Sequence, residues 1–106
     1  MDFTRLNIKG LLGAARISTG ANMTLAEKDR AFILMIDATA ASKTVTLDLP
    51  ENACCIVANT GSNAFTLKNV SGDTGTSVAA DTVYLVAASR TANSSDVIAL
   101  VAAGGK

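Results

Sequence analysis

Histidine and tryptophan are absent from this 106-residue chain, and aromatic residues make up only 4% of it. Without histidine, the chain cannot build a histidine-based catalytic triad or an imidazole site for a metal ion. Nine Lys and Arg residues balance nine Asp and Glu residues, so the formal net charge is zero. The chain therefore has no basic field to attract nucleic acid or an anionic membrane surface.

Long hydrophobic runs are also lacking. The longest strongly apolar run, residues 31–36, is far shorter than the roughly 20 apolar residues that a transmembrane helix needs. The first ten residues do not combine a basic start, a long apolar middle and a small-residue cleavage site, so we expect synthesis in a cytoplasm. The two cysteines, Cys54 and Cys55, are adjacent, and in a strand they would point to opposite faces as small hydrophobic residues.

What the chain does contain is a series of short β-type segments separated by Gly, Asn, Asp and Ser. Residues 43–49 alternate between apolar and polar side chains, which predicts a half-buried strand that Pro50 ends. Residues 31–37 and 53–59 are continuous apolar runs that end in Asp37 and Asn59, which is typical of strands covered on both faces. Such strands are either central in the fold or have one face against a partner.

Residues 53–59 and 64–70, joined by a turn at 59–63, resemble a hairpin, and further strands are expected at 82–88 and 96–102. Weaker segments at 15–19 and around Val78 bring the total to about seven or eight strands. The sequence thus predicts an all-β domain over residues 15–106, a small sandwich or barrel of the jelly-roll type. Its only helical signal is one turn at 24–29, where Thr24 and Glu27 fit a capping box.

Residues 1–14 follow no regular period, although Phe3, Leu6, Ile8, Leu11 and Leu12 are apolar. One interpretation is a frayed terminus or an additional edge strand. The other is an extended arm that docks these five side chains on another subunit or a larger assembly, because disordered tails usually contain fewer large apolar residues.

Asp73 begins the triplet Asp73-Thr74-Gly75, the signature of aspartic proteases, and a retroviral-type protease would be an all-β homodimer of similar length. In that family the triplet ends an apolar strand, whereas here it lies in a Gly-rich loop that we interpret as a surface turn. Asp37, Asp48, Asp73, Asp81 and Asp96 are not spaced like a calcium loop, and no phosphate-binding loop is present. We therefore expect no enzyme, no cofactor and no metal site.

The order of segments resembles a known family. Residues 23–29, an apolar strand, residues 43–50 (KTVTLDLP), residues 56–62 (IVANTGS) and residues 64–67 (AFTL) are similar to a small β-domain of tailed-bacteriophage virions. That domain occurs in head decoration (cement) proteins and in modules of head or tail fibres. The similarity covers roughly residues 22–102, although the aromatic residue usual in the family's last strand is replaced by the segment at 96–100.

The resemblance implies a structural virion protein, made in the cytoplasm of the infected bacterium and bound to the capsid exterior as a homotrimer. Its partners would be the major capsid protein and further copies of itself, with no role for nucleic acid or membrane. The arm would lie across neighbouring capsid subunits. The alternative is a fibre or adhesin module, and a remote alternative is the protease that uses Asp73.

Overall fold

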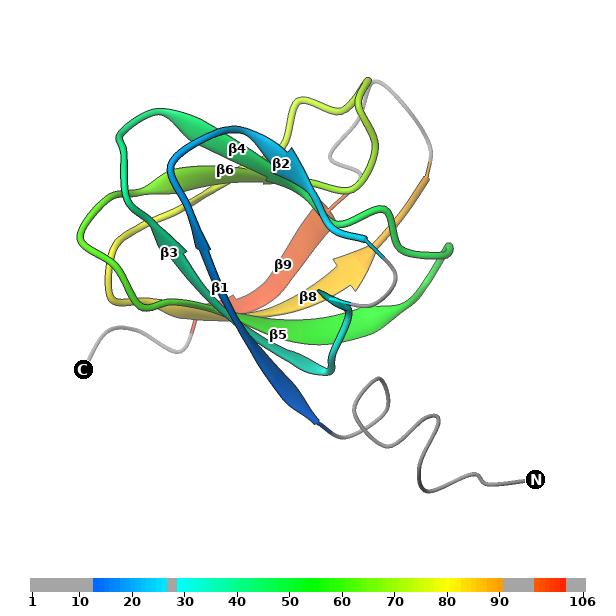
Figure 1. The fold of residues 1–106 in the computed structure, drawn as a ribbon. Coiled ribbons are helices and arrows are strands. Elements are labelled where there is room, and N and C mark those ends of the chain that lie inside the picture. Colours follow the sequence, from blue (N-terminus) through cyan, green and yellow to red (C-terminus); the bar gives the residue numbers. More distant parts are fainter. Residues whose placement is uncertain (1–12, 27–28, 91–96, 103–106) are drawn as a thin grey trace.

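The computed structural model describes residues 13–26, 29–90 and 97–102, and this part of the chain is built from strands arranged in two mixed sheets (Figure 1). The strands are β1 (Ala14–Thr19), β2 (Met23–Thr24), β3 (Ile33–Ala38), β4 (Lys43–Thr46), β5 (Cys54–Asn59), β6 (Phe65–Lys68), β7 (Thr76–Val78), β8 (Val83–Ala88) and β9 (Val97–Ala102). No α-helix is present among the described residues; the one helical position among them is Asp29, in a 3-10 turn where its N donates to Ala26 O at 2.9 Å. The prediction of a compact all-β fold is confirmed.

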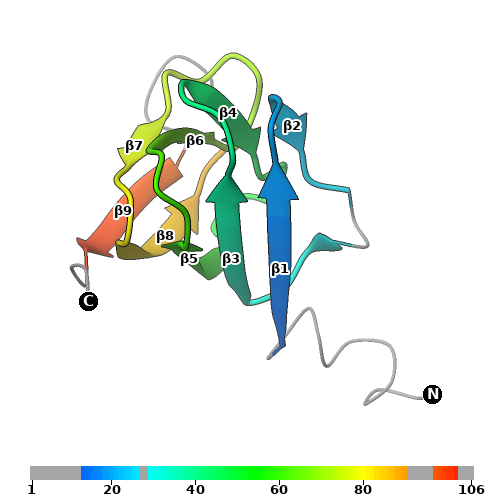
Figure 2. The same cartoon turned by 60° about the vertical axis from the view of Figure 1, so that its left-hand side comes forward.

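The chain passes back and forth between the two sheets. Strands β1, β3, β5, β8 and β9 form a five-stranded sheet in that order, and β2, β4, β6 and β7 form a four-stranded sheet. The first three strands of each sheet are parallel, and the later ones are antiparallel. Figure 2 shows β1 and β3 running side by side in the same direction. Consecutive strands up to β6 therefore lie in different sheets.

This connectivity corrects the predicted hairpin between residues 53–59 and 64–70. Strand β5 pairs with β3 and β8, whereas β6 pairs with β4 and β7, so the two segments never share a ladder. The turn between them instead carries the chain from one sheet to the other. Within this turn Asn59 is buried, and its side chain bonds the loop internally, with Nδ2 donating to Asn63 O at 2.8 Å and Oδ1 accepting from Gly61 N at 3.0 Å.

Alternating side chains from both sheets form one core. Leu34 and Ile36 of β3, Val57 of β5 and Val86 of β8 are fully buried on the inner face of the five-stranded sheet. The four-stranded sheet contributes buried residues that include Val45, Phe65, Leu67 and Val78, and Leu25 and Leu47 extend beyond its strands. The predicted alternation at 43–49 is confirmed by the burial of Val45 and Leu47, although β4 itself ends at Thr46.

One local expectation is wrong, and another is only partly confirmed. Thr24 belongs to the short strand β2 rather than to a helical cap, because its segment pairs with β4 and Leu25 N donates to Thr46 O at 2.9 Å. Residues 27 and 28, including Glu27 of the expected capping box, lie outside the described residues. Asp73 is 3% exposed, so its side chain is buried, although Ser71, Gly72 and Thr74 of the same loop are exposed at the surface.

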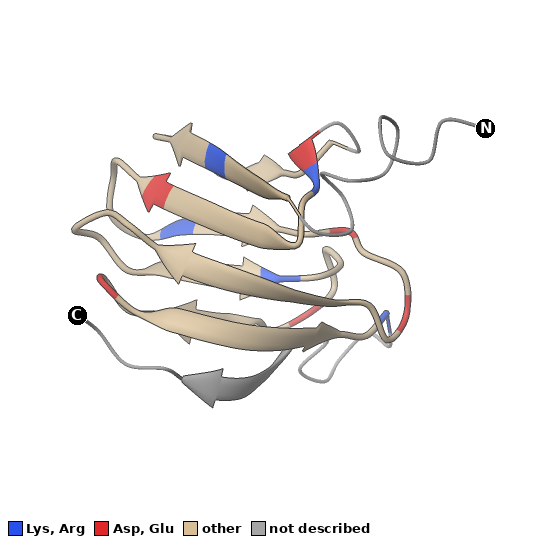
Figure 3. Ribbon diagram, turned by 90° about the horizontal axis from the view of Figure 1, so that it is seen from below, with Lys and Arg blue, Asp and Glu red and all other residues tan. Residues whose placement is uncertain are grey.

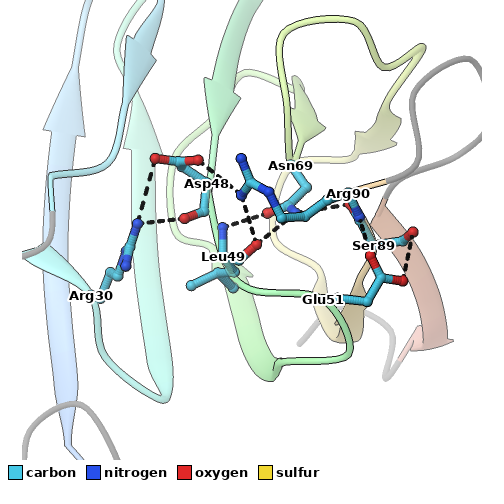
Figure 4. Close-up of polar contacts among 7 residues, drawn as sticks. All are labelled: Arg30, Asp48, Leu49, Glu51, Asn69, Ser89 and Arg90. Carbon is cyan, nitrogen blue, oxygen red and sulfur yellow. Dashed lines mark hydrogen bonds and ion pairs between the residues drawn. The ribbon is translucent and has the colours of Figure 1, made fainter.

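One end of the molecule is closed by a polar network that joins four loops (Figure 4). The buried side chain of Asn69 accepts from Leu49 N at 2.7 Å and donates to Leu49 O at 3.0 Å and to Ser89 O at 2.9 Å. Asp48 lies 3.0 Å from Arg90 and 3.6 Å from Arg30, and Glu51 accepts from Arg90 N and Ser89 Oγ. The two arginines and two carboxylates balance in charge, so the network stabilises the loops without creating a charged site.

Candidate interaction surface

The two sheets differ sharply in the chemistry of their outer faces. On the four-stranded sheet, outward positions in register across the strands are polar. One row consists of Thr24, Thr46 and Lys68, and the next consists of Thr44, Thr66 and Ser77. Threonine combines high β-propensity with a hydroxyl group that water can solvate, so this face is suited to solvent.

The outer face of the five-stranded sheet is apolar at the corresponding positions. Its first row consists of Ile33, Ile56 and Leu85 on β3, β5 and β8, and its second row consists of Met35, Ala58 and Val83. All six residues are partly exposed, whereas their neighbours Leu34, Val57 and Val86 point into the core. These six residues are called the apolar face below.

Few charges border the apolar face. Seen from below (Figure 3), β5 and β8 carry no Lys, Arg, Asp or Glu, and the charges on β1 and β3 are one arginine and one aspartate. These are Arg16, in register with Met35, and Asp37, in register with Ser18. Both line a shallow hollow at the β1 side of the sheet together with Met35 and Thr60. The formal charges of Arg16 and Asp37 at this edge therefore sum to zero.

The physical consequence is a surface suited to binding protein rather than a small polar molecule. Removing apolar area from water contributes about 25 cal/mol per Å², and contiguous apolar patches rimmed by polar residues mark interaction sites in soluble proteins. Antiparallel sheets with one free face usually alternate between apolar inward and polar outward residues, as the four-stranded sheet does here. The apolar face departs from that pattern on three adjacent strands.

The two cysteines lie on opposite faces of β5, as the sequence predicts. Cys54 is exposed on the side of the apolar face, in register with Ala87, and Cys55 is buried in the core. Burial, followed by the nearby Cys54, raises the pKa of the Cys55 thiol from 9.0 to about 11. Cys55 is consequently inert near neutral pH, and Cys54 is the thiol accessible to reagents.

Asp73, the residue of the remote protease hypothesis, lies in the loop between β6 and β7. Its backbone N donates to Val70 O at 3.1 Å, which closes a tight turn, and Gly75 adopts a φ of 85° shortly after it. Strand β7 starts at Thr76, so the Asp-Thr-Gly triplet precedes a strand rather than ending one. Among the described residues, no three His, Cys, Asp or Glu side chains are grouped so that they could hold a metal ion.

The predicted arm residues Phe3, Leu6, Ile8, Leu11 and Leu12 lie outside the described residues, so their placement stays a prediction. Ala14, the last residue of the predicted arm, begins β1. The six residues of the apolar face were not named from sequence as a site. The signal for four of them was the apolar character of segments 31–37 and 53–59, which indicated strands covered on both faces.

Comparison with known proteins gives no match: no family model, curated protein or solved structure is similar to this chain. Within the part of the chain that the structure describes, no helix is long and apolar enough to cross a membrane.

Proposed function

We propose that this protein is a structural component of a tailed-bacteriophage virion that binds the outer surface of the capsid as a homotrimer and stabilises the shell. The apolar face carries this proposal, because it gives a small neutral domain a large surface for contacts with protein. The resemblance of segments 43–50 and 56–62 to decoration proteins suggests that the assembly to which it binds is a phage capsid. In this proposal the protein acts by binding and catalyses no reaction.

The finer architecture belongs to the same proposal. The two sheets, which share one core, would form a small sandwich, and residues 1–14 would extend from it as an arm. The arm precedes β1, the edge strand of the sheet that carries the apolar face. Phe3, Leu6, Ile8, Leu11 and Leu12 would contact neighbouring subunits of the major capsid protein.

The mechanism is stabilisation by linkage. A protein that binds only the closed shell stabilises it by RT ln(1 + [L]/Kd), about 2.7 kcal/mol per site at a free concentration 100 times Kd. The three arms of one trimer are linked, so after one arm binds, the others bind at a high effective concentration. The trimer therefore binds the capsid tightly even when each arm alone binds weakly. The shell then withstands the pressure of packaged DNA better with the protein than without it.

Co-sedimentation with capsids that lack the protein tests this proposal. We expect the full chain to pellet with such capsids, to saturate at a fixed copy number and to raise the temperature at which filled capsids release DNA. A variant without residues 1–12, which leaves β1 intact, should bind much more weakly. Free protein that stays in the supernatant at micromolar concentration would refute the capsid role.

The same preparations distinguish the alternatives. A fibre or adhesin module would bind host cells or their surface glycans instead of the capsid. An aspartic protease would cleave peptides as a dimer and lose that activity in Asp73→Asn. Either result would replace the capsid proposal.

A further inference from the structure

We infer that the apolar face is the self-association surface of this protein, where the five-stranded sheet of one copy packs against the same sheet of other copies. The inference supplies the interface for the oligomer in the proposed function. It nevertheless depends on the oligomeric state of the free protein and not on capsid binding.

The contrast between the two outer faces shows that the apolar character is a property of this surface alone. Both sheets present outward residues in aligned rows, and the polar row Thr44, Thr66 and Ser77 is the counterpart of the apolar row Ile33, Ile56 and Leu85. A strand with apolar residues on both faces is typical of strands with cover on both sides. The core covers one side of β3, β5 and β8, and a second layer of protein would cover the other.

Charge favours a second copy as this layer. Near the apolar face, β1 and β3 contribute Arg16 and Asp37, and β5 and β8 contribute no charge. Neither of the two side chains forms an ion pair with another described residue. Two copies that meet along this edge can place Arg16 of one against Asp37 of the other, so the face is complementary to itself.

The overall charge is consistent with this choice. The formal net charge of the whole chain is zero, so copies do not repel one another on approach. A strongly basic or acidic partner would meet only one opposite charge at this edge and would leave its other charges desolvated. Closed symmetry also brings the same patch of every copy to one axis, in a dimer or a trimer alike.

Light scattering of the full chain provides the test, with one charged residue introduced at the centre of the face. Ala58→Arg adds a long cation between Met35 and Val83 and keeps the Cβ atom of the alanine, so no packed carbon is lost. Ile56→Lys is a second variant in a different row. The matched control is Thr44→Arg, which adds the same charge to the outer face of the four-stranded sheet. Circular dichroism and thermal unfolding identify variants that keep the fold.

We expect the wild-type chain and Thr44→Arg to have at least twice the monomer mass of 10.8 kDa. Folded Ala58→Arg should have the monomer mass, with self-association weakened by at least 100-fold. The native thiol of Cys54, at the border of the face, gives an independent reading. It should react slowly with a thiol reagent in the wild-type oligomer and faster in Ala58→Arg, while the buried Cys55 should not react in either protein.

Two results would overturn the inference. One is an oligomer that persists unchanged in folded Ala58→Arg and Ile56→Lys, because the interface then lies elsewhere. The other is a wild-type monomer. If Cys54 is protected in that monomer and becomes reactive after deletion of residues 1–12, the arm covers the face instead. If Ala58→Arg dissociates the oligomer but the wild-type oligomer does not bind capsids, the inference is supported and the capsid proposal is refuted.

Discussion

Removal of the buried amide of Asn69 is the sharpest perturbation of the fold. Asn69 is fully buried, and its side chain makes three hydrogen bonds, one from Leu49 N at 2.7 Å and two to Leu49 O and Ser89 O at 3.0 and 2.9 Å. In Asn69→Ala all three are lost at once. Leu49 O keeps its bond from Arg90 at 2.9 Å, whereas Leu49 N loses its side-chain acceptor.

The magnitude follows from these contacts. Each hydrogen bond contributes about 1 kcal/mol net, and the loss of three gives about 3 kcal/mol. A domain of this size has a total free energy of unfolding of about 5–15 kcal/mol, so the loss is a large fraction of it. With about 4–8 °C per kcal/mol, a loss of about 3 kcal/mol should lower the melting temperature by about 12–24 °C.

Urea and thermal unfolding followed by circular dichroism measure this loss. Asn69→Leu separates hydrogen bonding from packing, because leucine fills similar volume and makes none of the three bonds. The matched control is Asn22→Ala, which removes one exposed bond from Thr44 N and should cost less than about 1 kcal/mol. A loss below 1 kcal/mol in both Asn69 variants would refute the claim that this amide holds the loops together.

Two further predictions concern the loop before β7 and the core. Gly75→Ala should destabilise the fold by about 1–3 kcal/mol in urea unfolding, because the residue has a φ of 85° and an added Cβ would lie 2.7 Å from Thr66 Cγ2 and 3.0 Å from Leu67 O. An unchanged midpoint would contradict this geometry. Because the pKa of Cys55 is raised to about 11, its neutral thiol stabilises the fold fully below pH 9.0, and this contribution should be lost as the pH rises towards 11. Cys55→Ala should flatten that decline and Cys54→Ser should not, so equal slopes in the two variants would rule out Cys55 as its source.

The strands were largely predictable from local sequence, because alternation reports which side chains are buried. Val45 and Leu47 were assigned to the core from their spacing alone, and the unbroken apolar run at 53–59 indicated cover on both faces. Pairing was not predictable in this way. A turn such as 59–63 fits a hairpin and a crossing to the opposite sheet equally well, since the choice depends on long-range partners.

A recurring sequence pair indicates the parallel strands, although no single segment reveals it. Thr24-Leu25 and Thr46-Leu47 occupy equivalent positions at the ends of β2 and β4, and this recurrence was a sign of stacked parallel segments. The burial of Asn59, Asn69 and Asp73 was also missed, because polar residues in loop segments ordinarily face water. Here the two asparagines instead satisfy backbone groups where loops cross the ends of the sheets.

A cryo-electron microscopy reconstruction of undecorated capsids, with and without the added protein, tests the central claim most directly. The account predicts additional density at three-fold positions on the capsid exterior, composed of β-domains whose five-stranded sheets face one another. Two identical reconstructions under saturating protein would contradict the capsid role. Density in which these sheets face solvent would contradict the assigned interface.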